Sequence, residues 1–237
     1  MSKQTAVVFG ATGAIGSAIC DWFNIHNYSV IAISRKKVED ISNHTDRLSL
    51  NWDGNADIDI LSTIKEQSIN AVVWAQGANL NDNIYSFDLT QHEAIYQANV
   101  TYILLSLQAL LKNKSLAPSA RLCVISSIWQ NIARQNKLSY CITKSALQGL
   151  IQSISIDLGA DGYLINAVLP GATDTPMTRA NLKIEQITTL EKATPLNSLP
   201  TLADISNLVG FLCSQNNTGI TGQFIAADRG FSNARII

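Results

Sequence analysis

The sequence has no excess of charge of either sign and no long hydrophobic run. Its 17 basic and 18 acidic residues leave a formal net charge of -1 at pH 7, and this balance argues against a nucleic-acid partner, which would require concentrated positive charge. A membrane-spanning helix needs about 18 consecutive apolar residues, and no such run is present. The first residues, MSKQTAVVFG, enter an apolar run directly rather than a signal peptide. We therefore expect neither a nucleic acid nor a membrane as partner.

Cysteine is also scarce. Cys20, Cys123, Cys141 and Cys213 lie far apart, inside apolar patterns, and none of their spacings is typical of metal ligands. This distribution predicts buried, reduced thiols, no metal site and a cytoplasmic location.

What is present favours one α/β domain. A length of 237 residues and a hydrophobic content of 46% allow a sizeable core. Short apolar runs alternate with helical patterns, and repeats, low-complexity segments and linkers are absent. We predict a single domain over residues 1–237, doubly wound and Rossmann-like, with a mostly parallel sheet of about seven strands. The expected strands are 5–9, 28–33, 47–51, 71–75, 122–125, 163–169 and 222–226.

A glycine-rich turn follows the first expected strand and precedes a helical pattern. This is the context of a phosphate-binding loop, in which Gly10 permits the tight turn, Gly13 lets the backbone approach a pyrophosphate, and Gly16 lets the helix pack on the strand. The helix N-terminus would offer N–H groups and partial positive charge to that pyrophosphate. An ordinary glycine-rich turn is the alternative.

The second expected strand ends in Ser34, Arg35, Lys36 and Lys37, and the first carboxylate after it is Glu39. Proteins that prefer NAD usually place an acidic residue here to bind the ribose 2′-hydroxyl. A hydroxyl followed by cations instead suits a 2′-phosphate. We therefore expect NADP(H) rather than NAD(H), although a solvated basic turn would leave the preference open.

Two further positions have alternative interpretations. Asp53 follows the third strand and would either accept a hydrogen bond from an adenine amino group or serve as a turn aspartate. Asn99 lies in a long apolar helical pattern over residues 89–111, preceded by a probable helix at 57–67. A buried asparagine needs hydrogen-bond partners, so it is either a satisfied core amide or the holder of a water beside Lys144.

Tyr140 and Lys144 are the strongest candidates for chemistry. Residues four apart on a helix share a face, and a nearby cation favours the phenolate. This spacing predicts a tyrosine with a lowered pKa that exchanges protons near neutral pH. Ser127 ends the preceding strand, where its hydroxyl would face the same cleft. A chance pairing of tyrosine and lysine on a helix is the alternative.

Loops at the ends of other strands complete the expected site. Gly77, after the fourth strand, would let the backbone lie against the cofactor, and the sixth strand ends in Pro170 and Gly171. Residues 176–200 are interpreted as a substrate flap or, alternatively, a surface helix. A helix over 201–213 should begin with Thr201 as N-cap and Asp204 completing a capping box.

These features together resemble the short-chain dehydrogenase/reductase family in its compact single-domain form. The resemblance covers essentially the whole chain, including the thirteen-residue gap from Ser127 to Tyr140. Three departures stand out: Phe9 replaces a threonine before a GxxGxxG loop, residues 74–77 read Trp-Ala-Gln-Gly, and residues 228–230 read Asp-Arg-Gly. The matching residues are Gly10 to Gly16, Asn99, Ser127, Tyr140, Lys144, Pro170, Gly171, Thr175, Met177 and residues 220–223.

The resemblance implies an oxidoreductase that transfers a hydride between NADP(H) and a small-molecule carbonyl or secondary alcohol. Tyr140 would be the acid or base, Ser127 would hold the carbonyl, and Lys144 would lower the tyrosine pKa and bind the nicotinamide ribose. Asn99 would position a relay water. The cofactor contacts it suggests are Gly10, Thr12, Gly13, Ile15, Gly16, Ser34, Arg35, Asp53, Ala75, Gln76, Gly77, Tyr140, Lys144, Pro170, Gly171, Thr173 and Thr175.

Two further expectations concern partners. The substrate pocket should include residues 128–130, Arg134 and residues 178–182, with Arg134 pointing to an anionic or polar substrate group. The apolar helices at 99–111 and 139–158 suggest a homodimer or homotetramer. The competing function is a nucleotide-binding regulatory or scaffold protein that keeps the fold without turnover.

Overall fold

The computed structural model describes residues 3–35, 47–51, 64, 68–175, 178–179 and 182–234. Its centre is one parallel seven-stranded sheet in the order β3-β2-β1-β4-β5-β6-β7. The predicted fold class is therefore confirmed. The strands are β1 (Gln4–Phe9), β2 (Tyr28–Ser34), β3 (Arg47–Asn51), β4 (Ile69–Trp74), β5 (Leu116–Ile125), β6 (Leu164–Pro170) and β7 (Phe224–Ala227).

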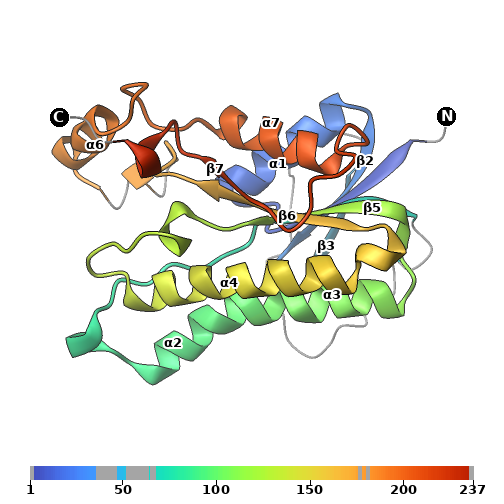
Figure 1. Cartoon of the computed structure of the whole chain (residues 1–237), viewed down its shortest axis with the longest axis horizontal. Helices are drawn as coiled ribbons and strands as arrows, with labels where there is room; N and C mark the ends of the chain where they lie inside the picture. Colours follow the sequence, from blue (N-terminus) through green and yellow to red (C-terminus); the bar gives the residue numbers. More distant parts are fainter. Residues whose placement is uncertain are drawn as a thin grey trace.

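Helices cover both faces of the sheet (Figure 1). On one face lie α1 (Ala14–Ile25) and α7 (Leu202–Cys213); on the other lie α2 (Leu89–Tyr96), α3 (Tyr102–Lys112) and α4 (Leu138–Asp157). A further helix, α6 (Ile184–Lys192), lies beyond one end of the sheet. Short 3-10 turns occupy η2 (Ile84–Ser86), η4 (Ile128–Gln130), η5 (Gly159–Asp161) and η6 (Phe231–Asn233).

The two-residue period of the strands divides the core into two layers. On β1, Val7 and Phe9 face the layer under α3 and α4, whereas Ala6 and Val8 face the layer under α1 and α7. All four side chains are fully buried. Strands buried on both faces read as continuous apolar runs, which is why they could be found in the sequence.

The order of the strands reverses between β1 and β4. From β1 the chain proceeds outward to β2 and β3, then returns to β4 and continues the other way to β7. In open α/β sheets, ligands bind outside the carboxyl ends of the strands at such a reversal. The end of β1 carries the glycine loop, so the fold places this loop at the expected crevice.

The long helical pattern at 89–111 is not one regular α-helix. A π-helical turn, η3 (Gln97–Thr101), separates α2 from α3 and contains Asn99. Wide π-turns inside α-helices occur frequently at functional sites, and this one carries a candidate catalytic residue.

Among the described residues, the continuous segment Leu89–Lys112 is long and apolar enough to cross a membrane by length and composition alone. Its mean hydropathy is 1.3, and half of the apolar window is buried inside the fold. Ile103, Leu107 and Leu110 supply much of that hydropathy, and they pack into the core layer between the sheet and α4. Core packing therefore accounts for this segment.

Other boundaries also differ from the expected ones. β5 begins at Leu116, six residues earlier than predicted, because it pairs with β4 through a register shift near Ile69. The helix expected at 57–67 lies outside the described residues except for Ile64, which is buried. The α7 capping box is confirmed: Thr201 Oγ1 accepts from Asp204 N at 3.2 Å, and Asp204 Oδ2 accepts from Thr201 N at 2.8 Å.

Candidate active site

A tight turn joins β1 to α1 at the sheet reversal. Gly10 has φ of +76°, and a Cβ there would lie 2.4 Å from the backbone N of Gln76. A Cβ on Gly16 would lie 2.2 Å from Gly10 O. No side chain fits at either position, because backbone atoms already occupy the space. The fold therefore requires both glycines, as the sequence predicted.

Gly13 is a different case. It is the N-cap of α1 with φ of -71°, and a Cβ there would make only an ordinary contact at 3.4 Å. The helix it opens has no capping side chain and no acidic residue in its first turn. A helix N-terminus of this kind favours an anion, so this end of α1 fits a cofactor pyrophosphate.

The end of β2 lies beside the glycine turn. Ile33 O accepts hydrogen bonds from Gly10 N at 2.8 Å and Ala11 N at 3.2 Å. Of the residues expected to select the cofactor, Ser34 is buried and Arg35 is exposed. Lys36, Lys37 and Asp53 lie outside the described residues.

A cavity of about 660 Å³ opens at the carboxyl ends of β4, β5 and β6. This volume lies within the range of about 300–1,000 Å³ typical of small-molecule sites. The lining runs from Ile15 on α1 to Gly77, Tyr140 and Pro170. Residues from the predicted cofactor loops and the predicted catalytic set therefore line one space.

The catalytic candidates converge on this cavity. Tyr140 and Lys144 come from the first two turns of α4, while Ser127 follows β5 and caps η4. Tyr140 and Ser127 share a side-chain hydrogen bond. Lys144 Nζ lies 5.7 Å from the centroid of the Tyr140 ring and donates to Ile125 O at 3.1 Å. The structure thus brings together the three residues that the sequence singled out.

Burial controls the electrostatics of this group. It raises the pKa of Tyr140, against the opposing effect of the Ser127 hydrogen bond. Burial also lowers the pKa of Lys144, to about 8. The expectation of a lowered tyrosine pKa is therefore wrong in direction, because desolvation disfavours the phenolate and the ammonium donates to a backbone carbonyl.

Asn99 ties the catalytic residues to the loop after β4. Its Oδ1 accepts from Ala78 N at 2.7 Å, and its Nδ2 donates to Ala78 O at 3.1 Å and Thr143 Oγ1 at 2.9 Å. The side chain is thus a satisfied core amide, which was one of the two alternatives. A Cβ on Gly77 would lie 3.3 Å from Asn99 Oδ1 and 3.7 Å from Lys144 Nζ, so Gly77 allows the loop to pass this close.

Gln76 stands out in the same loop. Both Nε2 and Oε1 are buried without a hydrogen-bond partner, and the residue lines the cavity beside Ala75 and Gly77. Buried polar groups are nearly always hydrogen-bonded. The amide therefore fits a polar ligand such as the cofactor, which would supply the missing partners.

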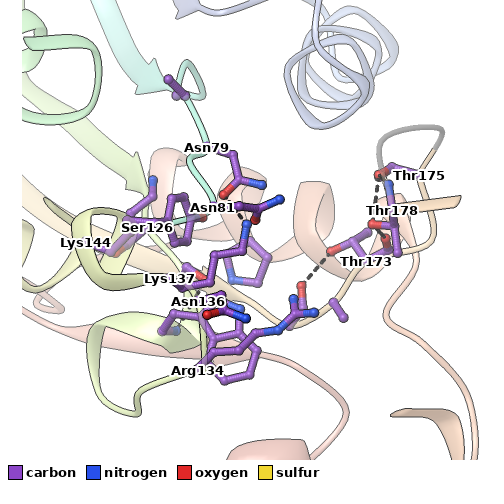
Figure 2. A pocket seen from close by; sticks show the side chains of 18 of the residues that line it. Asn79, Asn81, Ser126, Arg134, Asn136, Lys137, Lys144, Thr173, Thr175 and Thr178 are labelled. Carbon is purple, nitrogen blue, oxygen red and sulfur yellow. Dashed lines mark hydrogen bonds between the residues drawn. The ribbon is translucent and has the colours of Figure 1, made fainter. Parts of the chain in front are cut away.

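The loop after β6 closes the opposite side of the cavity. Pro170, Gly171, Thr173 and Thr175 all line it. Thr178 Oγ1 donates to Thr173 O at 2.6 Å and lies 3.1 Å from Thr175 Oγ1, so the loop is held by its own threonines (Figure 2). These residues fit the nicotinamide end of a dinucleotide.

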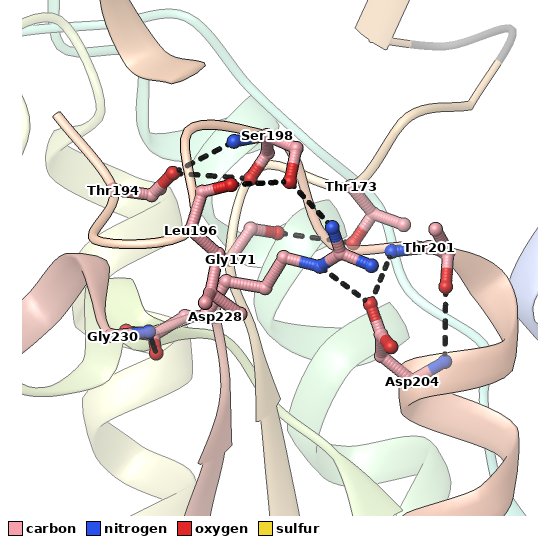
Figure 3. A network of polar contacts seen from close by, with 10 residues as sticks. Gly171, Thr173, Thr194, Leu196, Ser198, Thr201, Asp204, Asp228 and Gly230 are labelled. Atoms are coloured by element: carbon pink, nitrogen blue, oxygen red, sulfur yellow. Dashed lines mark hydrogen bonds and ion pairs between the residues drawn. The ribbon is translucent and has the colours of Figure 1, made fainter. Parts of the chain in front are cut away.

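A polar network braces this loop from behind (Figure 3). Arg229 Nε lies 2.9 Å from Asp204 Oδ2, and its guanidinium also donates to Ser198 Oγ. A Cβ on Gly171 would lie 2.9 Å from Asp228 Cβ. Arg229, which departs from the family pattern, thus connects the C-terminal segment to α7 and to the end of the expected flap.

The expected substrate pocket is only partly reproduced. Trp129, Arg134, Thr178 and Leu182 line the cavity, whereas Ile128 and Gln130 are outside its lining. Ile128 is buried in the core, and Gln130 is buried, where it accepts a hydrogen bond from Ser126. The segment expected as a flap contains α6, and Gln186 on this helix lines the cavity, so both the flap and the surface helix stay predictions.

Several residues that line the cavity were not predicted from the sequence, among them Asn79, Asp82 and Lys137. Lys137 is the N-cap of α4 and stands three residues before Tyr140. The i, i+3 spacing on the catalytic helix was the available signal. A lysine before a helix is usually a surface cation, so the residue type gave no reason to expect burial.

Comparisons with known proteins agree with this site. A family model described as enoyl-(acyl carrier protein) reductase matches residues 10–232. The oxidoreductase YmfI of Bacillus subtilis (strain 168) is 25% identical over 245 residues, covering 97% of this chain and 99% of that protein. The 3-oxoacyl-(acyl-carrier-protein) reductase FabG of Buchnera aphidicola subsp. Schizaphis graminum (strain Sg) is 25% identical over 240 residues, covering 97% and 98%.

Solved structures show the same fold. A short-chain dehydrogenase family protein from Francisella tularensis subsp. tularensis SCHU S4 superposes with a TM-score of 0.88 at 23% identity, covering 98% of this chain and 100% of that one. The family match extends from the glycine turn to the C-terminal segment and includes every catalytic candidate. The chain therefore belongs to the short-chain dehydrogenase/reductase family and is an NAD(P)-dependent oxidoreductase.

Proposed function

We propose that the protein is an NADP(H)-dependent reductase of small carbonyl compounds, which also oxidises the corresponding secondary alcohols. The observation that carries the proposal is the convergence of Ser127, Tyr140 and Lys144 on one cavity. The same cavity is lined by Ile15 from the helix after the glycine turn and by Pro170 after β6. A carbonyl held at Ser127 would thus lie in the space that also receives the nicotinamide.

The protonation states suit reduction. A tyrosine whose pKa is raised by burial stays protonated at neutral pH, and a protonated phenol is the form that donates to a carbonyl oxygen. Ser127 donates a second hydrogen bond that positions this oxygen. Lys144, with a pKa of about 8, is mostly charged at pH 7 and stabilises the phenolate left after proton transfer.

The nicotinamide cofactor supplies the hydride when it is bound. This chain's own residues would hold it: the N-terminus of α1 would receive the pyrophosphate, Gln76 would offer its unpartnered amide, and the threonine loop after β6 would take the nicotinamide end. Asn99 acts as a positioning residue because its amide ties Ala78, in the loop after β4, to Thr143, which precedes Lys144 on α4.

The preference for NADP(H) rests on the end of β2. Arg35 is exposed directly after this strand, and the strand ends beside the glycine turn. A guanidinium binds phosphate oxygens through paired hydrogen bonds. Among the described residues at this strand end, Ser34 and Arg35, no carboxylate is available for the 2′-hydroxyl of NAD.

The test is a panel of ketones and aldehydes assayed by loss of NADPH absorbance, with the wild type and Tyr140→Phe. Removing one proton donor should lower kcat by about 10²–10⁴-fold while NADPH still binds, as measured by calorimetry. Binding of NADPH without turnover of any carbonyl would instead support the scaffold function.

The same assay with both cofactors tests the preference. Wild type should have the lower KM for NADPH, and Arg35→Ala should raise this KM by roughly 10-fold or more, as expected for a charge-assisted contact. The KM for NADH should change little. Equal effects on both cofactors would contradict the role of Arg35.

A further inference from the structure

The end of the cavity away from the glycine turn is strongly polar. One segment, residues 79–86, contributes Asn79, Asn81, Asp82 and Asn83, and residues 134–137 contribute the rest of this wall. The two segments are joined by a hydrogen bond from Asn83 Nδ2 to Asn136 Oδ1 at 3.1 Å. A wall of amides and charges is unsuited to an apolar substrate, because polar groups left without partners are costly to bury.

Lys137 is the most unusual residue in this wall. Its side chain reaches the cavity although the residue is only 8% exposed. Its Nζ donates to Asn79 Oδ1 at 2.6 Å and, more weakly, to Leu80 O at 3.4 Å. An ammonium has three donors, so one remains, and within the described part of the chain Lys137 forms no ion pair.

The Asp82 carboxylate attracts this lysine electrostatically, but within the described part of the chain the two form no ion pair. Asp82 Oδ1 accepts from Ser139 N at 3.0 Å, and its Oδ2 accepts from the Ser139 hydroxyl. The carboxylate is therefore engaged in holding the start of α4. A buried ammonium without a paired anion is unfavourable, and an anionic ligand would relieve that cost.

The position of Lys137 relative to the chemistry is well defined. Its Nζ lies 5.8 Å from the centroid of the Tyr140 ring, nearly the same distance as Lys144 Nζ at 5.7 Å. Arg134 adds a second cation nearby and rests on the Trp129 ring at 5.9 Å. Figure 2 shows Arg134, Asn136, Lys137 and Asn79 gathered at this end of the cavity.

We infer that the substrate is a small oxo acid, with Lys137 binding its carboxylate while its ketone lies between Ser127 and Tyr140. This inference rests on the proposed reductase function and specifies its substrate class. The local charges favour a monoanion: Lys137 and Arg134 contribute two positive charges and Asp82 one negative charge. A carboxylate balances the remaining charge, whereas a phosphate dianion would exceed it.

A purely structural role for Lys137 makes a different prediction. Through Asn79 and Leu80 the lysine ties the loop after β4 to the start of α4, and losing that tie would affect all substrates alike. Binding of a carboxylate would affect acids alone. A comparison of each acid with its neutral ester therefore separates the two roles.

The experiment uses 2-, 3- and 4-oxopentanoate and their methyl esters: the acids vary the distance between ketone and carboxylate, and each ester removes the charge at the cost of one added methyl group. Initial rates with NADPH are measured for wild type, Lys137→Met, Lys137→Arg and Lys112→Met. The last is a matched control, since Lys112 is exposed at the end of α3 and outside the cavity lining.

We expect wild type to prefer at least one acid over its ester. Lys137→Met should raise the KM of that acid by about 10–100-fold, the range for a lost charge-assisted hydrogen bond, and leave the KM of the ester within about twofold. Lys137→Arg should retain most of the preference, and Lys112→Met all of it. Equal losses for acid and ester, or no preference in wild type, would overturn the inference while leaving the reductase proposal intact.

A binding measurement keeps the inference testable without turnover. Saturation-transfer NMR on the protein with NADP+ should show contact with the preferred oxopentanoate that weakens in Lys137→Met and not in Lys112→Met. If wild type contacts acids no better than esters, the carboxylate site is refuted. If the acids bind through Lys137 but no carbonyl in the panel is reduced, the proposed reductase function fails instead.

Discussion

Lys144 is an ammonium held in a nearly dry environment. It is 4% exposed, and its Nζ donates a hydrogen bond to the Ile125 carbonyl oxygen at 3.1 Å. Burial disfavours the charged form and lowers its pKa from the usual 10.5 to about 8. The enzyme therefore keeps a destabilising charge at its centre at neutral pH, a common arrangement where function requires it.

This burial predicts an unusual dependence of stability on pH. Between about pH 8 and 10.5 the unfolded lysine is protonated and the native one is not, so wild-type stability should rise with pH. The difference corresponds to roughly 3 kcal/mol across that window. Lys144→Met has no ionisable group at this position, so its stability should rise less between pH 7 and pH 10 than that of the wild type. Thermal unfolding at pH 7 and pH 10 should show wild type gaining several degrees relative to the variant.

An unchanged gap in melting temperature between the two proteins at both pH values would contradict the lowered pKa of Lys144. The absolute gap is less informative, because the variant also leaves the Ile125 carbonyl without its donor. That loss is independent of lysine ionisation, whereas the change with pH is not.

The sequence was sufficient to single out Tyr140, Lys144 and Ser127, which the structure brings to one cavity, because their types and spacing are those that proton transfer to a carbonyl oxygen would require. It gave the wrong direction for the tyrosine pKa, since desolvation depends on how tightly the surrounding chain packs. Lys137 could not be found for the same reason: whether a lysine at a helix start is buried depends on a loop 57 residues away, which includes Leu80.

At the level of elements, two departures from the family pattern, Phe9 and Trp74, are connected by strand pairing. Phe9 and Trp74 are register partners on β1 and β4, and their rings stack with parallel planes and centroids 5.8 Å apart. Trp74 Nε1 also donates to Ser106 Oγ on α3 at 2.7 Å. Phe9, which stands where the family has a threonine, and Trp74 thus form an aromatic pair that belongs to the core. The sequence alone did not show that these two positions are neighbours. Because β1 pairs with β4, Phe9 and Trp74 pack together and are best understood as one joint change.

The contact between α1 and α7 gives a prediction about packing. A Cβ on Gly210 would lie 2.3 Å from the Trp22 ring. That ring cannot easily move, because it stacks on His26 at 3.7 Å and donates to Asn207 Oδ1 at 3.1 Å. Gly210→Ala should therefore destabilise the protein by about 1–3 kcal/mol, despite the better helix propensity of alanine.

Gly149 in α4 is the matched control, because a Cβ there meets nothing within 4 Å. Gly149→Ala should stabilise by up to about 1 kcal/mol through helix propensity alone. Chemical denaturation of both variants measures the two effects. Similar changes in the free energy of unfolding for both variants would show that the helix contact at Trp22 is not as tight as described.

At the scale of the whole molecule, the glycine turn, the catalytic helix and the loop after β6 meet because parallel strands place their carboxyl ends on one edge of the sheet. For this reason, assigning strands and helices in the sequence was enough to predict that the loops after β1, β4 and β6 would lie around one cavity. Arg134 was expected to bring a charge to the substrate pocket, but the rest of the polar wall, at residues 79–86 and 135–137, was not foreseen, because it depends on hydrogen bonds between two loops, such as that between Asn83 and Asn136. Periodic apolar patterns in the sequence predict helices, strands and the layers they form. Contacts between loops can be seen only in the folded structure.

The outer face of α2, α3 and α4 leads to a final prediction, on assembly. Tyr96, Leu104 and Ile142 are 38%, 47% and 42% exposed, on helices that cover the same face of the sheet (Figure 1). Exposed large apolar side chains on helices that share one face of the sheet suggest a contact between copies of the chain. We therefore expect a dimer or tetramer, with a mass by light scattering that is a multiple of 25.7 kDa.

A charge in the centre of this face should disrupt the assembly, because an unpaired carboxylate is costly to bury. Leu104→Glu should shift the mass toward 25.7 kDa. Ile25→Glu is the control: Ile25 is more exposed, at 78%, but it ends α1 on the opposite face of the sheet. A monomeric wild type would refute the assembly, and equal dissociation by both variants would move the interface away from α3. Dissociation by Leu104→Glu alone would place the contact on α3, directly after the π-turn that carries Asn99, and so bring assembly next to an element that lies against the active site.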